Sequence, residues 1–364
     1  MKLKPAFVYK ISQVLAITVF WVLAGVLVEL NNAVNYDPVS HKHFLHFIFG
    51  NTWLEHLLIT AIGPVIGGIL GGSFIVFYQR GRLKGKTYAQ KLFIHSVLYI
   101  LFVSACILLV GIIGALTSPE DESFWRKFYR DIFSFRVLRL LIDWYFIVVL
   151  TIFLLDVSEI YGSGILRNLL LGRYYLPGKE DRIFMFLDLK SSTTMAEQIG
   201  DERYFRMLRY FYEVANEAIL NHHGEIYQYV GDEIIVSWEK EPGLRDANCL
   251  QCFGAVKAAV AHQRDYFISN FGVVPEFKAG IHSGEVTTGQ IGSVKKDIVY
   301  SGDVLNTTAR IVALCNQYSQ TLIISEVLYE ALKTAPGYEF NFLDNPLLRG
   351  KTVPLRLYGV SMLG

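Results

Sequence analysis

Four long apolar stretches in the first 157 residues limit what this chain can fold into. They are Ile11–Val28, Leu57–Tyr78, Leu92–Leu116 and Leu140–Val157. Crossing a bilayer as a helix takes about 20 mainly apolar residues, and backbone groups in lipid must be hydrogen-bonded within the structure. Each stretch therefore predicts a membrane-spanning helix. The fourth differs from the others because Asp143 and Asp156 flank its uncharged core.

Small residues concentrate in Gly63–Gly72, inside the second apolar stretch. Small side chains let the backbones of two membrane helices approach closely. The segment therefore predicts close helix packing, either within one chain or between two copies. We expect Asp156 to lie near the membrane interface or to face another helix.

Basic residues in the short connections predict how the helices are oriented. Lys2, Lys4 and Lys10 come before or at the start of the first stretch. The second connection contains five basic residues and no acidic one, namely Arg80, Arg82, Lys84, Lys86 and Lys91. Because Lys/Arg-rich loops stay in the cytoplasm, the N-terminus is predicted to be cytoplasmic. Four crossings return the chain to the same side, so we predict a multi-pass cell-membrane protein with a cytoplasmic C-terminal half.

Composition divides the chain at about the same place. Hydrophobic residues make up 52% of it, and the excess lies before about residue 157. We predict a four-helix transmembrane domain over 1–157, a linker over 158–181 and a globular domain over 182–364. The formal net charge of +1 predicts no nucleic-acid partner. Cys249 and Cys252 lack a second Cys or His pair, so they predict buried thiols rather than a zinc site.

The C-terminal half alternates between strand-like and helix-like patterns. The expected order is a strand at Arg182–Leu187, a helix at Glu202–Asn221, strands at Glu225–Val230 and Glu233–Trp238, a helix at Asp246–Phe271, and strands at Glu276–His282 and Glu285–Ile291. A helix near Asp303–Cys315, a strand at Thr321–Ile324, a helix at Ser325–Lys333 and terminal strands in Tyr338–Val360 follow. The order predicts an α+β domain with a ferredoxin-like βαββαβ core.

Two aspartates are placed to meet at one end of this core. Asp188 follows the first strand, and Asp232 lies in the Gly231-Asp232 turn of a predicted hairpin. In a split βαβ sheet the hairpin neighbours the first strand, so we expect the two carboxylates to lie close together. Mg²⁺ favours such a site, using one or two carboxylates together with water and phosphates.

Basic and amide side chains form a second group of candidates. Asn306 and Arg310 stand four residues apart on a predicted helix and so share one face. Arginine binds phosphate in a forked geometry and stabilises transition-state charge. Arg349 and Lys351 flank Gly350 in a late loop and are candidates for binding phosphate.

Four sequence stretches in the C-terminal half resemble a known family. They are FMFLDLKSST at Phe184–Thr193, YVGDEIIVSW at Tyr229–Trp238, AGIHSGEVTTGQIG at Ala279–Gly292 and GDVLNTTARI at Gly302–Ile311. Together they resemble the class III adenylate/guanylate cyclase catalytic domain, in the family's order and over about 180 residues. Four membrane helices before one such domain also resemble bacterial members of this family.

The resemblance implies a role for most of the candidates. Asp188 and Asp232 would bind two Mg²⁺ or Mn²⁺ ions, with help from the backbone carbonyl of Leu189. Asn306 would position the ribose, and Arg310 would stabilise the transition state at the α-phosphate. Lys351, beside Arg349, would bind the terminal phosphates. In the family the metal-binding pair and the Asn/Arg pair come from different protomers, so the resemblance implies a homodimer with two sites.

The implied reaction converts a nucleoside triphosphate into its 3′,5′-cyclic monophosphate and pyrophosphate, for intracellular signalling. Two positions that read the base depart from the family. Gln228 stands where adenylate cyclases usually have Lys and guanylate cyclases Glu, and Val299 stands where Asp or Thr is common. Asp297 or Ser301 would replace Val299 if the loop is shifted. We expect ATP as the substrate, with GTP and pyrimidine nucleotides as alternatives.

Two other functions fit parts of this pattern. A diguanylate cyclase shares the acidic hairpin, but Val230 replaces the first glycine of its signature, and Asn306 and Arg310 have no counterpart there. A catalytically inactive module that binds nucleotide would explain the unusual base-reading positions. The full set of Asp188, Asp232, Asn306 and Arg310 favours an active enzyme.

Overall fold

The computed structural model describes residues 4–34, 53–79, 82–83, 85–117, 125–126, 128–130, 133–161, 174–294 and 296–363. The chain divides into two compact units, Phe7–Tyr161 and Gly162–Gly364, the latter together with Met1–Ala6. Residues 162–173 of the predicted linker lie outside the described residues, as do Lys2, Arg80 and Lys84 of the predicted cytoplasmic loops.

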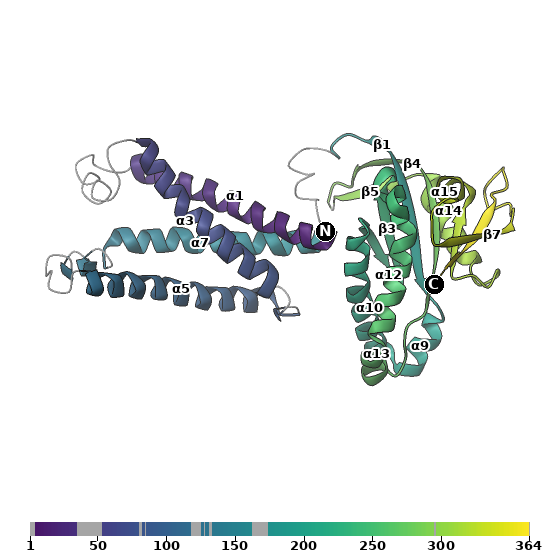
Figure 1. The fold of residues 1–364 in the computed structure, drawn as a ribbon, viewed down its shortest axis with the longest axis horizontal. Helices are drawn as coiled ribbons and strands as arrows, with labels where there is room; N and C mark the ends of the chain where they lie inside the picture. The colour runs from purple at the N-terminus through teal and green to yellow at the C-terminus, as the bar shows by residue number, and fades with distance from the viewer. Residues whose placement is uncertain are drawn as a thin grey trace. The chain divides into compact units, whose positions relative to one another are not determined.

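The N-terminal unit is helical (Figure 1). Its long helices are α1 (Pro5–Val34), α3 (Trp53–Ser73), α5 (Tyr88–Thr117) and α7 (Phe135–Tyr161), and a π-helical segment, η1 (Phe74–Gln79), continues α3. Among the described residues, three segments are long and apolar enough to cross a membrane: Pro5–Val28, Ile62–Gln79 and Val137–Ser158. The predicted third span falls in α5, where the apolar segment found, Tyr88–Phe102, is shorter. Three candidate spans therefore stand against the four predicted.

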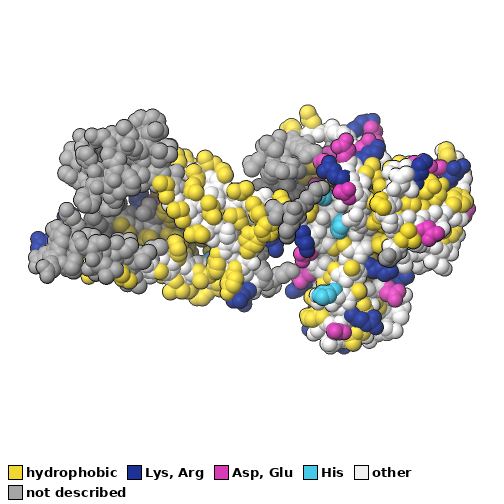
Figure 2. All heavy atoms as spheres, in the orientation of Figure 1, with side chains coloured by type: hydrophobic (Ala, Val, Ile, Leu, Met, Phe, Trp, Pro, Cys, Tyr) yellow, Lys and Arg dark blue, Asp and Glu magenta, His cyan; other side chains and the backbone are white. Residues whose placement is uncertain are grey.

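Apolar side chains cover much of the described surface of these helices (Figure 2). Leu15, Leu23, Leu27 and Phe93 are all more than half exposed. Exposure of such an apolar surface to water would be unfavourable, whereas contact with lipid chains would remove it from water. The surface therefore suits a membrane environment.

The Gly-rich segment packs against α1 within the chain. A β-carbon at Gly68 would lie 2.6 Å from the Cα of Thr18, and one at Gly25 would lie 2.8 Å from Cγ of Pro64. Such distances are too short for any side chain, so α1 and α3 approach closely because these residues are glycines. Of the two packing alternatives for this segment, the structure shows packing within the chain.

Two acidic residues of this unit are paired with basic residues. The Asp156 carboxylate on α7 lies 2.7 Å from the Lys91 ammonium on α5. Asp143 lies 3.9 Å from Arg139, one turn away on the same helix. Asp156 thus faces another helix, which is one of the two placements expected for it.

The C-terminal unit is built on an eight-stranded sheet with the order β2-β3-β1-β4-β6-β8-β7, in which β5 also pairs with β4. The strands are β1 (Gly178–Leu189), β2 (Glu225–Val230), β3 (Glu233–Glu239), β4 (Phe277–Ile291), β5 (Asp297–Ser301), β6 (Leu322–Ser325), β7 (Tyr338–Asp344) and β8 (Leu357–Met362). The order β2-β3-β1-β4 and the antiparallel pairing of β1 with both neighbours match the predicted ferredoxin-like core.

Helices cover both faces of this sheet (Figure 1). They are α9 (Ser192–Ile199), α10 (Asp201–Asn221), α11 (Lys240–Leu244), α12 (Asn248–His262), α13 (Arg264–Phe271), α14 (Asp303–Leu314) and α15 (Glu326–Leu332), with a short 3-10 turn, η2 (Arg245–Ala247). Alternate residues of β1 point to opposite faces. Ile183 and Met185 join the core beneath α10 and α12, whereas Phe184 and Phe186 join the core beneath α14. We call this second face the α14 face.

Glycines let α14 lie directly on the sheet. A β-carbon at Gly280 would be 2.6 Å from the backbone nitrogen of Val312, and one at Gly284 would be 2.8 Å from Cγ2 of Val304. Gly284 also explains one error of the sequence analysis, which placed a strand break here. Instead β4 continues unbroken, because Gly284 stays paired with Arg182 of β1.

Two further elements differ from the predictions. The single helix expected over Asp246–Phe271 is divided at Gln263 into α12 and α13. The short strand β5, which contains Val299, was not predicted. Cys249 and Cys252 are buried on α12 as expected, and burial raises the pKa of the Cys249 thiol to about 12.

Candidate active site

The carboxylate of Asp188 lies in a row of three charged residues across the sheet. Asp188, the second-last residue of β1, is paired with Glu233 of β3 on one side and with Lys278 of β4 on the other. Residues directly opposite each other in a sheet share one face. The Nζ of Lys278 lies 3.3 Å from Oδ2 of Asp188, and the Lys278 side chain is only 9% exposed. The row is therefore held together by a largely buried ion pair.

The second predicted aspartate lies beside this row. Gly231 and Asp232 form the turn between β2 and β3, and Gly231 adopts φ 62°, which glycine tolerates without strain. The hydroxyl of Tyr212 donates a hydrogen bond of 2.8 Å to the Gly231 carbonyl. Burial and then the charge of Asp232 raise the pKa of Asp188, while Lys278 opposes the rise. The structure thus brings Asp188 and Asp232 within electrostatic reach of each other.

A third carboxylate adds to the negative charge. The pKa of Glu233 is raised to about 7 by burial first and then by Asp188 and Asp232, with Lys278 acting in the opposite direction. Three carboxylates beside one ammonium leave an excess of negative charge, which a divalent cation would relieve.

The described part of the chain holds no group of three or more His, Cys, Asp or Glu side chains in an arrangement that would bind a metal ion by itself. Cations at Asp188 and Asp232 would therefore depend on water and on substrate phosphates for their remaining ligands, as Mg²⁺ commonly does. The donor set fits Mg²⁺ or Mn²⁺ bound together with a nucleotide.

Two of the predicted phosphate-binding residues, Lys351 and Arg310, lie together beside α14. The ammonium of Lys351 is bonded to Oδ2 of Asp303. This hydrogen bond is the largest factor that lowers the pKa of Asp303, and the charge of Arg310 contributes. Gly350 lies against Arg310, since a β-carbon there would be 3.5 Å from Nη2 of Arg310. The cluster thus joins α14 to the loop before β8.

Arg310 carries an unused hydrogen-bond donor. Its Nη1 is buried, yet it has no hydrogen-bond partner in the part of the chain that the structure describes. A buried guanidinium nitrogen without a partner is costly, and a phosphate oxygen would satisfy it. Asn306 lies one turn earlier on α14 and is exposed. Arg349 is also exposed, beside Gly350.

The two predicted base-reading positions lie on strands that are not paired with each other. Gln228 is exposed on β2, directly after a bulge at Tyr227, and Val299 is half-buried on β5. The backbone N–H of Tyr300 donates to the hydroxyl of Tyr227 at 3.4 Å. Burial raises the pKa of Tyr227 most, and Asp297 adds to the rise. Asp297, the suggested substitute for Val299, thus lies within electrostatic reach of β2.

Sequence reasoning missed three charged residues of these clusters. Lys278 and Glu233 meet Asp188 only through the register of three strands, and Asp303 is placed by its bond to Lys351. An alternating pattern predicts the face on which a strand residue lies but does not predict its lateral neighbour. Leu189, the remaining predicted site residue, is the buried last residue of β1.

Sequence comparison finds relatives of this half of the chain. "Adenylate cyclase 2" of Rhizobium meliloti is 34% identical over 182 residues, which cover 50% of each chain. An adenylate cyclase of Anabaena cylindrica is 27% identical over 189 residues, covering 49% of this chain and 36% of that one. The chain thus spans half or less of the length of these curated relatives.

A solved bacterial light-regulated adenylyl cyclase has a similar fold, with a TM-score of 0.53 at 16% identity over 63% of this chain and 66% of that one. The family model described as "Adenylate and Guanylate cyclase catalytic domain" matches residues 176–360. This range covers half of the chain and contains every predicted site residue. The chain therefore belongs to the family of adenylate and guanylate cyclase catalytic domains.

Proposed function

We propose that this chain is a membrane-anchored nucleotidyl cyclase that converts a nucleoside triphosphate, with ATP favoured, into its 3′,5′-cyclic monophosphate and pyrophosphate. The product would serve intracellular signalling. The observation that carries the proposal is the family match over a site in which Asp188 and Asp232 are electrostatically coupled. ATP is favoured because the relatives named above are adenylate cyclases.

Asp188 and Asp232 would hold two Mg²⁺ or Mn²⁺ ions, assisted by the carbonyl of Leu189. When bound, the cations would lower the pKa of the attacking 3′-hydroxyl and neutralise the leaving pyrophosphate. Lys278 pairs with Asp188 in the metal-free protein, so a bound cation would have to share this carboxylate with the ammonium. Most of the rate enhancement would come from positioning and charge stabilisation.

Arg310 would bind the α-phosphate, which supplies the acceptor that its buried Nη1 lacks among the described residues. Lys351 would bind the terminal phosphates, leaving its present partner Asp303 or sharing its donors between them. Arg349 would add charge at the same end of the nucleotide. Asn306, exposed one turn before Arg310, would orient the ribose.

A homodimer would unite the two clusters. The described contacts join Asp188 with Glu233 and Lys278, and Arg310 with the Asp303–Lys351 pair. We infer that each site takes its metal-binding acids from one protomer and its Asn306–Arg310 pair from the other. Two equivalent sites would then form across the interface.

The N-terminal unit would anchor this dimer in the cell membrane. Three described segments satisfy the length and hydropathy of a span, and α5 would supply the fourth. With four spans, the N-terminus and the catalytic domain would both be cytoplasmic, where nucleoside triphosphates are found.

Base selection would depend on Gln228 and on residues near Val299. The Gln228 amide both donates and accepts hydrogen bonds, so it could pair with several base edges. Asp297, which lies near Tyr227, would provide the acceptor that Val299 lacks. GTP and pyrimidine nucleotides are the alternative substrates under this proposal.

The full chain in lipid nanodiscs, supplied separately with ATP, GTP, CTP and UTP and Mn²⁺, tests the proposal. We expect a 3′,5′-cyclic monophosphate, identified by mass, and the highest rate with ATP. Asp232→Asn should lower the rate by at least about 100-fold while leaving the melting temperature of the domain nearly unchanged. A folded wild-type protein that forms no cyclic product from any nucleotide would contradict the proposal.

A further inference from the structure

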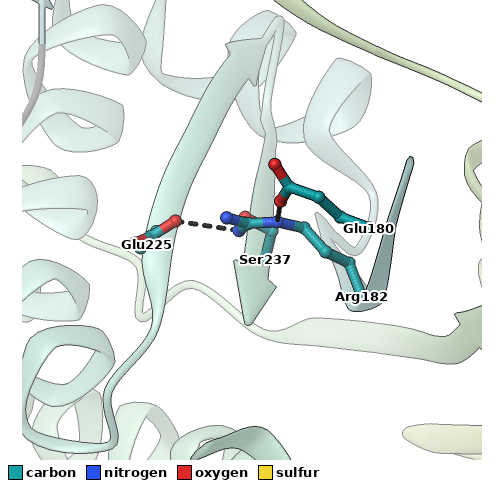
Figure 3. A network of polar contacts seen from close by, with 4 residues as sticks. All are labelled: Glu180, Arg182, Glu225 and Ser237. Atoms are coloured by element: carbon teal, nitrogen blue, oxygen red, sulfur yellow. Dashed lines mark hydrogen bonds and ion pairs between the residues drawn. The ribbon is translucent and has the colours of Figure 1, made fainter. Parts of the chain in front are cut away.

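The buried guanidinium of Arg182 is the centre of a polar network (Figure 3). Arg182 lies on β1 and is 1% exposed. It donates hydrogen bonds to Glu180 at 2.9 Å, to Glu225 at 2.8 Å and to Ser237 at 3.1 Å. Because Ser237 belongs to β3 and Glu225 begins β2, this one side chain reaches across a strand and fixes the start of β2.

The same guanidinium also contacts β5. Its Cζ lies 4.8 Å from the ring centroid of Tyr300. The Tyr300 ring lies 4.9 Å from that of Tyr227 and 5.4 Å from that of Phe184, both in edge-to-face arrangements. We call Arg182, Tyr227 and Tyr300 the Arg182 bridge, because together they connect β2 with β5.

This contact requires β4 to curl over the α14 face. Tyr300 is paired with Thr288 of β4, whereas Phe184 is paired with His282. Six residues of a flat strand span about 20 Å, too far for the two rings to touch. Their contact therefore shows that β4 bends between these positions. The bend includes Gly284, and glycine inside a strand commonly marks such a bend.

No backbone ladder joins the two strands that the bridge connects. In the described sheet β2 pairs with β3, and β5 pairs with β4. The β-bulge leaves Tyr227 outside the register with β3, and the pairing of β2 with β3 resumes at Gln228. Tyr227 directly precedes Gln228, and Tyr300 directly follows Val299. The bridge is thus anchored next to both base-reading positions.

We propose that the Arg182 bridge sets the spacing between the strand positions of Gln228 and Val299, so that Arg182, Tyr227 and Tyr300 are positioning residues for nucleotide selection. This inference rests on the proposed function. A base is distinguished by donors and acceptors a few ångströms apart, so a small shift of β5 relative to β2 would change which base fits.

The composition of the bridge fits positioning better than it fits stability alone. An ion pair that requires a guanidinium to be buried contributes little net stability compared with well-packed hydrophobic residues of similar size. Such a pairing does fix the orientation of its partners relative to one another, because the planar guanidinium binds two carboxylates in its plane and leaves one face for an aromatic ring. Arg182 binds two carboxylates and contacts the ring of Tyr300. Tyr300 lies on β5, the strand that carries Val299.

Three bridge variants and one control test the proposal in the full chain. Tyr227→Phe removes only the hydroxyl that accepts from Tyr300, Tyr300→Leu removes the ring, and Arg182→Lys keeps the charge without the planar fork. The control is Tyr329→Leu, which removes a ring stacked at 3.9 Å on Tyr358, away from β2 and β5. Melting temperatures identify variants that fold.

The readout is the ratio of nucleotide affinities, measured by competition of ATP, GTP, CTP and UTP against a fluorescent nucleotide in Ca²⁺ to prevent turnover. Tyr300→Leu should change the ratio of the affinities for the best and second-best nucleotides by about tenfold. Tyr227→Phe should change this ratio by a smaller factor. Tyr329→Leu should leave the ratio unchanged at a similar loss of stability.

The outcomes separate this inference from the proposed function. Wild-type protein that cyclises a nucleotide, with folded bridge variants that keep its affinity ratio, would overturn the positioning role alone. If Tyr329→Leu changed the affinity ratio as much as the bridge variants do, the change would reflect a general loss of stability. That result would also overturn the positioning role. Wild-type protein that neither binds nor cyclises any nucleotide would remove the proposed function and this inference together.

Discussion

The Nζ of Lys278 lies 3.3 Å from Oδ2 of Asp188, and both side chains belong to one row across β3, β1 and β4. The ammonium therefore occupies the neighbourhood in which a cation bound to Asp188 would sit. Like charges repel strongly at such distances where water is scarce.

Removal of this ammonium should strengthen metal binding. We expect Lys278→Met to lower the dissociation constant for Mn²⁺ by about threefold to tenfold, because a competing positive charge is lost. Calorimetry or electron paramagnetic resonance measures this without turnover. The matched control is Lys190→Met, since Lys190 is paired more loosely with Glu276 at 3.8 Å. Weaker Mn²⁺ binding in Lys278→Met would mean that the lysine organises the acids instead of competing with the metal.

Arg310 should act in the chemical step more than in binding. Its buried Nη1 has no partner among the described residues, so we expect it to engage the phosphate as charge develops. Arg310→Ala should lower kcat by about 100-fold or more and change KM much less. Arg356→Ala, which removes an exposed pair with Glu326, is the control. If kcat is retained in Arg310→Ala, the side chain is only part of the surface.

Glu233 should make the metal-free protein less stable as the pH rises. Its pKa is raised from 4.5 to about 7, chiefly by burial and then by Asp188 and Asp232. Between these values the folded protein holds a proton that the unfolded chain releases, so the free energy of unfolding falls as the pH increases through the window.

Glu233→Gln cannot lose this proton and should reduce the fall by about 1 kcal/mol, allowing for partial solvent screening. Melting curves in a chelator on either side of the window measure the difference. An identical pH dependence in wild type and variant would place the titration elsewhere.

The contact between α1 and α3 should not tolerate a side chain at Gly68. A β-carbon there would lie 2.6 Å from the Thr18 backbone, so Gly68→Val should destabilise the membrane unit by about 1–3 kcal/mol. Gly63 provides the control, because a β-carbon at that position meets nothing within 4 Å. Thermal unfolding in detergent distinguishes the two variants, and equal stability would refute the close contact.

Local patterns were enough to predict that Asp188 and Asp232 would lie near each other. The Gly231-Asp232 turn lies between two alternating runs, and such a turn allows few arrangements. Once the hairpin is placed beside β1, the ferredoxin-like order brings Asp188 next to it. These steps need only turn chemistry and topology, and the structure confirms the predicted order.

Long-range packing determined what the sequence left unpredicted. Gly284 looks like a strand break locally, yet it stays paired with β1, lies within the inferred bend of β4 and receives α14. β5 is only five residues long, and its place depends on that bend. Arg182 appeared merely to begin an apolar strand, because its partners Glu225, Ser237 and Tyr300 are distant in sequence. Such contacts depend on register and curvature, which a local pattern does not encode.

Gly280 and Gly284 leave no gap between α14 and β4. The helix that carries Asn306 and Arg310 therefore rests directly on the backbone of the sheet that carries Asp188, and any bulkier residue at either glycine would lift that helix away from the sheet.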